Sequence, residues 1–407
     1  MNSTPNAGLN DGLPSRADVV VVGGGTLGGW CAWMLRDAGL SVVLVERETL
    51  GRGASSRAAG MVRAQGGTPS AVHLGLWSRE FYLSQQARLG IDSGFVATGY
   101  FMPCFTDEDV VAAHDRIAMQ QREGLEVEWV EPDDVDHRNP NLAPGRTLGS
   151  SYAPGDGWID PPRNVQAYLA ACVRSGVTIA ERTAFTGLVE VDGAVAGVRT
   201  TRGDVAAGAV VLTGGPSLAA VGDLAGARIW AGGARHQVVV TEPHPDLAPE
   251  RVPMVFDVGS GIYWRPEEGG LLWGMSNPDE APGEATEFDD DYLARMRSRM
   301  AELVPVTASL GLRKRWAATI DYTPDHLPII GPLLRSSGSV RGAFVSAAGG
   351  HGMMWGPAVA RATADLVLRG STDVTDVSDL GMDRFDEAGR SRLAADPIAL
   401  PFPEHAR

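Results

Sequence analysis

DVVVVGGGTLGGWCAWMLRDAGLSVVLVE, residues 18–46, has the pattern of a strand, a glycine turn, a helix and a second strand. The run from Asp18 to Val22 is apolar and β-branched, which is typical of a strand buried on both faces. Thr26 to Ala38 carries small and apolar residues at helical spacing, and Gly39 ends this helix. Ser41 to Val45 repeats the buried-strand pattern. The order predicts an α/β unit of the Rossmann type.

The glycine turn has the spacing of a dinucleotide-binding site. Gly23, Gly25 and Gly28 fit G-x-G-x-x-G, and Glu46 ends the second strand about twenty residues later. The first glycine allows a sharp turn, the second lets a pyrophosphate approach the helix N-terminus, and the third lets helix and sheet pack closely. An acid at position 46 can accept from adenosine ribose hydroxyls and would repel a 2′-phosphate. FAD or NAD is therefore expected rather than NADP.

Composition limits the possible partners. The chain has 407 residues, enough for two domains or one large one, and its net charge of −15 argues against a nucleic-acid or membrane partner. Cys31, Cys104 and Cys172 are far apart and form no CxxC pair, so neither a disulfide framework nor a metal site is indicated. Residues 1–16 lack the apolar core of a signal peptide. We expect them to form a disordered arm of a cytoplasmic protein that binds a small molecule.

A polar, glycine-rich loop with three arginines follows Glu46. Its segment Gly51–Arg63, GRGASSRAAGMVR, resembles the second cofactor-wrapping motif of the FAD-dependent D-amino-acid-oxidase-like family, which includes sarcosine oxidase, glycine oxidase, and dimethylglycine and proline dehydrogenases. Five further segments resemble motifs of this family, in the family's order: GYFMPCFTDED from Gly99, VVLTGG from Val210, IYWRPEEGGLLWG from Ile262, WAATIDYTPDHLPIIGP from Trp316 and GGHGMMWGPAVARATADLV from Gly349. The resemblance covers nearly all of residues 17–368.

The resemblance implies an α/β fold in which a Rossmann-type FAD-binding domain is interleaved with an antiparallel-sheet substrate domain, a glutathione-reductase-2-like arrangement. Period-2 alternation in RHQVVVTEP and IYWRP agrees with an antiparallel sheet that has one solvated or ligand-facing side. GLEVEWVEPDDV from Gly124 reads as a strand followed by a polar turn. The expected domains are an FAD-binding domain of residues 17–95, 149–233 and 316–371, a substrate domain of residues 96–148 and 234–315, and a C-terminal extension of residues 372–407.

The residues expected to bind FAD come from the glycine turn, the end of the second strand, the wrapping loop, the turn after Thr213 and the GGHG turn. They are Gly23, Gly25, Thr26, Leu27, Gly28, Glu46, Arg47, Arg52, Ala54, Ser55, Ser56, Arg57, Ala59, Gly60, Met61, Gly214, Gly215, Gly349, Gly350, His351, Gly352, Met353 and Met354. Relatives that attach FAD covalently use a His in the loop or a Cys before the TPD stretch. Arg57 and Ala317 or Ala318 stand at these places, so noncovalent FAD is expected.

The GGHG turn, Gly349–Gly352, precedes a helix that starts near Pro357. A helix N-terminus with a glycine-lined approach favours anions. In the resembled family this turn faces the pyrimidine edge of the flavin, where the helix dipole would stabilise negative charge on the reduced ring. The alternative is an ordinary glycine turn in which His351 is satisfied locally.

Arg63, His351, Tyr263 and Met354 are the candidates for catalytic or substrate-binding roles. Arg63 matches the position at which sarcosine-oxidase-like enzymes place a carboxylate-binding arginine, and contact with pyrophosphate or solvent is the equal alternative. Relatives place a second basic residue where this chain has Met354 or Ile320. One half of the carboxylate clamp is therefore missing.

The remaining pocket candidates are mostly aromatic. Tyr263, Trp264, Trp355 and Met354 would form the walls, with Arg63, His351 and His236 as polar members, although the Trp and Met side chains fit a protein core equally well. An apolar site favours the neutral form of an amine because it disfavours ammonium. Leu272 stands where sarcosine oxidase has an oxygen-activating lysine, so O2 and another electron acceptor both stay open.

These features predict an FAD-dependent oxidoreductase that oxidises the C–N bond of an amine, or of an N-alkyl or cyclic amino acid, to an imine by hydride transfer to the flavin. One alternative keeps the fold but oxidises a 2-hydroxy acid, which would need His351 or His236 as a base. A second alternative is a flavin-carrying subunit of a larger complex. The sequence is compatible with a monomer or a homo-oligomer.

Overall fold

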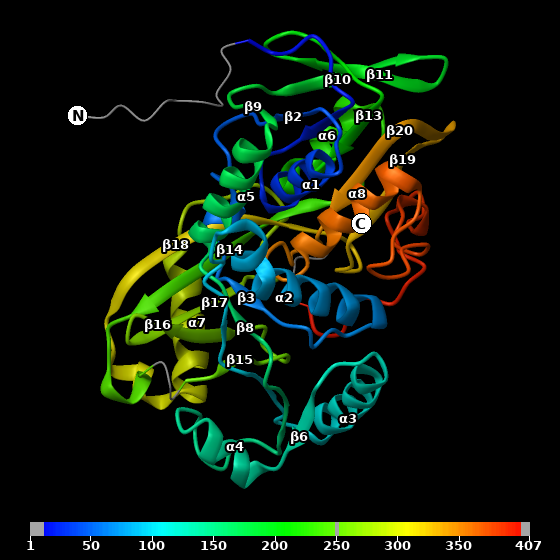
Figure 1. Ribbon diagram of the computed structural model, residues 1–407. Helices are drawn as coiled ribbons and strands as arrows, with labels where there is room; N and C mark the ends of the chain where they lie inside the picture. Colours follow the sequence, from blue (N-terminus) through cyan, green and yellow to red (C-terminus); the bar gives the residue numbers. More distant parts are fainter. Residues whose placement is uncertain (1–11, 249–251, 400–407) are drawn as a thin grey trace, which may run out of the picture.

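The computed structural model describes residues 12–248 and 252–399 (Figure 1). Residues 1–11, most of the expected disordered arm, lie outside the described residues. The end of this arm is ordered, because the carbonyl of Ser15 accepts a hydrogen bond from Ala206 N and Arg16 forms a parallel bridge with Ala206. The expectation of disorder is therefore wrong for Ser15 and Arg16, which extend the edge of a sheet.

A nine-stranded sheet occupies the upper part of Figure 1 and has the order β10-β11-β20-β13-β1-β2-β9, with β12 beside β11 and β19 beside β20. The parallel centre confirms the expected Rossmann-type unit: β1 (Val19–Val22), β2 (Val42–Val45), β13 (Ala209–Leu212) and β20 (Gly338–Ala347). The other strands are β9 (Thr178–Ala180), β10 (Phe185–Val191), β11 (Ala194–Thr200), β12 (Val205–Ala206) and β19 (Ile329–Arg335).

Both faces of this sheet are covered, which explains the uninterrupted apolar run in β1. Val19 and Val21 belong to a core cluster with helices on one face, whereas Val20 and Val22 belong to a cluster with β10–β12 on the other. The helices of the first sheet are α1 (Thr26–Asp37), α5 (Pro161–Ser175), α6 (Leu218–Leu224) and α8 (Gly356–Arg369).

A second, eight-stranded sheet has the order β18-β14-β17-β16-β15-β5-β7-β6 and lies below the first in Figure 1. Its strands are β5 (Tyr100–Pro103), β6 (Glu128–Val130), β7 (Ser150–Ala153), β14 (Gly232–Thr241), β15 (Met254–Phe256), β16 (Tyr263–Glu267), β17 (Gly270–Ser276) and β18 (Leu312–Tyr322). All pairs are antiparallel except β5 with β15. Helix α7 (Asp290–Leu303) packs on one face, and the other face turns toward the first sheet.

Smaller elements join the two sheets. β3 (Met61–Val62) and β4 (Val96–Ala97) pair with β8 (Gly157–Trp158) in a three-stranded sheet. The connecting helices are α2 (Pro69–Leu89), α3 (Asp107–Arg122) and α4 (Pro132–Arg138). Helix α4 replaces the expected polar turn, because Pro132 occupies the first helical turn and Asp133 and Asp134 favour its positive N-terminus.

Two of the expected boundaries between the domains lie at other positions in the structure. β7 lies in the second sheet beyond the expected boundary at Gly149. β18 pairs with β14 from Leu312 to Tyr322, so the boundary expected near Trp316 falls inside a continuous strand ladder. The chain therefore leaves the second sheet after Ala153 and again after Tyr322.

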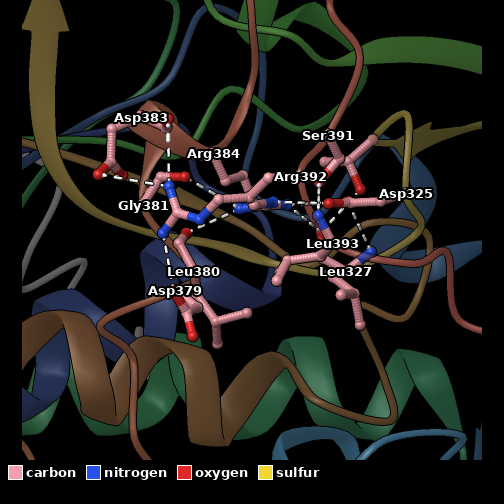
Figure 2. Close-up of polar contacts among 11 residues, drawn as sticks. Asp325, Leu327, Asp379, Leu380, Gly381, Asp383, Arg384, Ser391, Arg392 and Leu393 are labelled. Atoms are coloured by element: carbon pink, nitrogen blue, oxygen red, sulfur yellow. Dashed lines mark hydrogen bonds and ion pairs between the residues drawn. The ribbon is translucent and has the colours of Figure 1, made fainter.

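The described part of the C-terminal extension, residues 372–399, contains one short 3-10 helix, Met382–Arg384, and packs against the rest of the chain. Its strongest anchor is a buried ion pair between Arg384 and Asp325, 2.7 Å apart (Figure 2). A segment with little secondary structure is thus ordered by side-chain contacts.

Candidate active site

A cavity of about 450 Å³ is lined by residues of both large sheets. The first sheet contributes the turn between β1 and α1, the wrapping loop, the turn after β13 and the turn after β20. The second sheet contributes side chains of β14, β15, β16 and β18. Most of the expected cofactor-binding residues lie along this cavity, namely Gly23, Gly25, Thr26, Leu27, Glu46, Arg47, Arg52, Ala54, Ser55, Arg57, Ala59, Gly60, Met61, Gly214, Gly215, Gly350, His351, Gly352, Met353 and Met354.

Three expected cofactor-binding residues do not line the cavity. Gly28 serves packing, because a Cβ there would lie 1.8 Å from the carbonyl oxygen of Gly23. Ser56 is exposed in the wrapping loop. Gly349 has φ +60°, and its N–H donates to Asp321 Oδ2 at 3.1 Å. This residue therefore sets the conformation of the turn without lining the cavity.

The glycine turn leaves the N-terminus of α1 open. Gly23 has φ +104°, a left-handed conformation that an L side chain rarely adopts. The N-cap residue Gly25 provides no side-chain cap, while Thr26 N donates to Ser55 Oγ of the wrapping loop at 2.9 Å. Backbone N–H groups at such a terminus, together with the helix dipole, form an anion site.

Glu46 lines the cavity at the end of β2. Its Oε2 atom accepts a hydrogen bond from Gly24 N at 2.7 Å, and its Oε1 atom accepts one from Glu48 N at 2.8 Å. These two bonds fix the carboxylate at the wall of the cavity, beside the glycine turn.

The GGHG turn lines the cavity through Gly350, His351 and Gly352. The Nδ1 atom of His351 lies 3.0 Å from the carbonyl oxygen of Gly349, and its ring packs on Trp355 with centroids 4.0 Å apart. Burial and the neighbouring Arg63 hold the pKa of His351 well below its usual range, so the ring is neutral. Trp355 is fully buried behind His351 and does not line the cavity. Its expected place in the pocket wall is therefore wrong.

Asp321 also lines the cavity and was not among the residues expected there from the sequence. Besides Gly349 N, its carboxylate accepts hydrogen bonds from the backbone of Ala348 and Gly350, and burial raises its pKa. The only signal was an acid at the end of the otherwise apolar run AATI. Asp321 thus holds the GGHG turn in place from the neighbouring strand β18.

Arg63 is 3% exposed and lines the cavity. Its guanidinium donates to the carbonyl oxygens of Gln65 and Ile398, the second at 2.8 Å, and lies 5.6 Å from the ring centre of Phe256. No carboxylate of the described residues forms an ion pair with it within 4.0 Å. The buried carboxylate of Asp396 interacts with Arg63 electrostatically but forms no direct ion pair with it, so the guanidinium keeps N–H groups that a ligand could use.

A pair of neutral side chains from the second sheet, His236 and Tyr263, lines the same cavity as Arg63. The Nε2 atom of His236 lies 2.5 Å from the hydroxyl of Tyr263, and its Nδ1 atom lies 2.8 Å from Ser276 Oγ. Burial lowers the pKa of His236 to about 4 and raises the pKa of Tyr263. The pair offers hydrogen-bonding atoms to the cavity without adding a charge.

Trp264 does not line the cavity, because it follows Tyr263 directly in β16 and so points to the opposite face. It packs in the core cluster under α7 and is fully buried. Leu272 is likewise a buried core residue. Of the expected pocket walls, Tyr263 and Met354 line the cavity, joined by Phe256, Tyr100 and Ile320.

The family profile described as "FAD dependent oxidoreductase" matches residues 18–366. The chain belongs to this family. It is 28% identical to 4-methylaminobutanoate oxidase (formaldehyde-forming) of Paenarthrobacter nicotinovorans, over 92% of this chain and 46% of that protein. It is 30% identical to glycine oxidase of Geobacillus kaustophilus, over 88% of this chain and 95% of that protein.

A solved structure, L-proline dehydrogenase from P. horikoshii, superposes with a TM-score of 0.86 at 25% identity and covers 93% of this chain and 100% of that one. The chain spans about half the length of several curated relatives that it matches, among them dimethylglycine dehydrogenase of Rattus norvegicus at 45% of that protein. The fold is thus that of FAD-dependent oxidoreductases, as the resemblance implied.

The cavity of this FAD-dependent oxidoreductase fits the cofactor of its family. The open N-terminus of α1 suits a pyrophosphate, and Glu46 at the end of β2 suits ribose hydroxyls. An added Cβ at Gly23 or Gly28 would clash with the backbone of Thr213 or Gly23, so these glycines allow the tight turn that presents the helix N-terminus. Bound FAD would supply the acceptor for a hydride equivalent.

Two further properties concern the same oxidoreductase. Among residues 12–248 and 252–399, every helix is too short or too polar to cross a membrane. The described residues contain no group of three or more His, Cys, Asp or Glu side chains that could hold a metal ion.

Proposed function

We propose that this FAD-dependent oxidoreductase oxidises the C–N bond of a secondary or N-alkylated amine, or of a cyclic amino acid, to an imine. The observation that carries the proposal is the composition of one end of the cavity, where the neutral pair His236–Tyr263, Arg63 and apolar side chains come together. The names of the relatives support it, since they include a methylaminobutanoate oxidase, a glycine oxidase and sarcosine and dimethylglycine dehydrogenases.

Hydride transfer from the carbon beside the nitrogen requires that the nitrogen be unprotonated. Burial disfavours ammonium, because the charged form loses more solvation than the neutral amine. His236 and Tyr263 can hydrogen-bond the nitrogen without a carboxylate that would stabilise the ammonium form. This arrangement favours the amine form that can release a hydride.

Arg63 would bind a substrate carboxylate through two of its N–H groups. Met354 and Ile320 line the cavity in place of the second cation that some relatives use, so neither position adds a positive charge to that of Arg63. Apolar contacts with Tyr100, Phe256 and Met354 must therefore supply more of the binding free energy for the substrate. A substrate larger than glycine could make these apolar contacts.

The cofactor would be held without a covalent bond. Arg57 lines the cavity at the place of the attachment His, and Ala317 and Ala318 are buried alanines at the place of the attachment Cys. None of these side chains is a nucleophile that could join the flavin ring.

The test is a panel of substrates mixed with the purified protein under nitrogen, followed by loss of visible flavin absorbance. Proline and N-methyl amino acids larger than sarcosine should bleach the flavin, and 2-hydroxy acids of matching size should not. Bleaching by the hydroxy acids alone would overturn the proposal. Bleaching by amines that requires an added protein would point to a flavin-carrying subunit.

A further inference from the structure

The C-terminal extension contacts the active-site arginine directly. The carbonyl oxygen of Ile398 accepts a hydrogen bond from Arg63 Nη2 at 2.8 Å. The side chain of Ile398 is fully buried in the apolar cluster that contains Tyr263, Phe256 and Met61. A residue from the end of the described chain therefore supports the substrate end of the cavity.

A side-chain turn fixes that carbonyl. Asp396 Oδ1 accepts a hydrogen bond from Ile398 N at 3.1 Å, which holds the peptide groups of residues 396–398 in one orientation. Asp396 is 4% exposed and lies against Gly67, where an added Cβ would come within 2.0 Å of Asp396 Oδ1. The glycine thus allows the turn to approach the loop that carries Arg63.

The turn is tied to the rest of the protein through Asp325. The backbone N–H of Asp396 donates to the Asp325 carbonyl oxygen at 3.0 Å. The Asp325 carboxylate receives Arg384 Nε at 2.7 Å and Nη2 at 2.9 Å in a bidentate pair (Figure 2). Arg384 also donates to the carbonyl oxygens of Leu380 and Leu327.

This anchor is rigid because both partners are buried and fully hydrogen-bonded. The exposed fraction of the side chains is 0% for Arg384 and 2% for Asp325. A buried bidentate pair holds one geometry, since any displacement would leave a charge without partners. One residue, Asp325, therefore fixes the extension at two points, through its side chain and through its backbone.

We propose that the C-terminal segment 384–398 positions Arg63 for substrate binding, through the Asp325–Arg384 pair, the Asp396 turn and the Ile398 carbonyl. Asp396 and Arg384 are positioning residues in this scheme, because they act through Arg63 and do not touch the substrate. The inference deepens the proposed function and rests on the role of Arg63 given there.

Two substitutions of Asp396 separate the effect of its hydrogen bond in the turn from the effect of its negative charge. Asp396→Ala removes the acceptor for Ile398 N, whereas Asp396→Asn keeps an oxygen acceptor and removes the charge. Arg392→Ala serves as the control on the same segment, because Arg392 forms an ion pair with Asp379 at 2.8 Å with both side chains exposed. Such a surface pair contributes little.

The experiment measures dissociation constants from the perturbed flavin spectrum of the FAD-loaded protein, with pyrrole-2-carboxylate and uncharged pyrrole-2-carboxamide as probes. Asp396→Ala should weaken carboxylate binding about tenfold, the effect of misplacing a charge-assisted hydrogen bond, and leave carboxamide binding unchanged. Asp396→Asn should not weaken carboxylate binding, because it keeps the oxygen acceptor and removes only a negative charge that interacts with Arg63. Arg392→Ala should bind both probes as the native protein does. If Asp396→Ala does not fold, Arg384→Lys should show the same selective loss.

Unchanged carboxylate binding in the folded variant, or equal weakening of both probes, would overturn the inference. Arg63→Ala distinguishes this failure from failure of the proposed function. If Arg63→Ala loses carboxylate binding while Asp396→Ala does not, only the positioning scheme is wrong. If Arg63→Ala binds the carboxylate normally, the substrate role of Arg63 is wrong.

Discussion

The Nε2 atom of His236 and the hydroxyl of Tyr263 lie 2.5 Å apart in the cavity, although the residues come from the non-neighbouring strands β14 and β16. Strand β17 lies between these two strands and supplies Ser276, whose hydroxyl contacts the other ring nitrogen of His236. The substrate end of the cavity thus has a neutral hydrogen-bonded chain across three strands.

The buried neutral His236 should make stability depend on pH. Its pKa is about 4 in the folded protein and about 6.5 in the unfolded chain, so the unfolded state gains protons first as pH falls. The contribution is fully favourable above about pH 6.5 and is lost as pH falls to 4, by about 3 kcal/mol at 1.36 kcal/mol per pKa unit. Thermal melts between pH 7 and 4 measure this slope.

Two variants test whether His236 causes this pH dependence. His236→Gln removes the buried imidazole, and the control His137→Gln removes an exposed imidazole. His236→Gln should reduce the slope over this pH range, while the buried His351, whose pKa is also lowered, keeps part of it. His137→Gln should leave the slope unchanged. Identical slopes for the native protein and His236→Gln would show that another group is responsible.

Tyr263→Phe should weaken amine binding without loss of flavin. The phenol contributes one hydrogen bond to the cavity, worth about 0.5–1.5 kcal/mol, so dissociation constants for secondary amines should rise about two- to tenfold. Stopped-flow measurement of flavin reduction against amine concentration gives this constant. An unchanged constant, with flavin content equal to that of the native protein, would remove Tyr263 from the substrate site.

Glu46→Ala should release FAD more readily. Loss of charge-assisted hydrogen bonds costs about 1.5–3 kcal/mol, which corresponds to a tenfold or larger rise in the FAD dissociation constant. Glu46→Gln should lie between the alanine variant and the native protein, because an amide oxygen still accepts. Titration of each apoprotein with FAD measures the dissociation constants of the native protein and the two variants. Equal dissociation constants would place Glu46 outside the ribose site.

Acid precipitation should leave a yellow supernatant. The described cavity has no His or Cys at the two attachment positions, which hold Arg57 and Ala317 or Ala318. The measurement is the division of flavin absorbance between pellet and supernatant. Flavin that stays with the denatured pellet would show a covalent bond at a residue outside these positions.

The elements that carry the expected cofactor-binding residues could be predicted from the sequence because their signals are local. In Asp18–Glu46, strand, glycine turn, helix and terminal acid fall within one continuous segment, and β1, α1 and β2 form where the pattern placed them. The GGHG turn was equally recognisable before α8. Short-range backbone requirements of this kind are readable without knowledge of tertiary contacts.

The substrate half depends on which face of a strand a residue occupies. Tyr263 and Trp264 were both expected in the pocket, yet adjacent residues in a strand point to opposite faces, and only Tyr263 lines the cavity. The alternation of strand residues implies that only one of the two can line the cavity, but the sequence does not show which one. The contact of Arg63 with Ile398 joins residues 335 positions apart, and no local pattern indicates such a contact.

The most direct test of C–N oxidation is the rate of flavin reduction under nitrogen by proline and by sarcosine, glycine and lactate at equal concentration. The account predicts rapid reduction by proline or by a bulkier N-methyl amino acid, slow reduction by sarcosine and glycine, and none by lactate. Fast reduction by glycine or sarcosine would contradict the preference for a larger substrate. Reduction by lactate without reduction by any amine would contradict C–N oxidation itself.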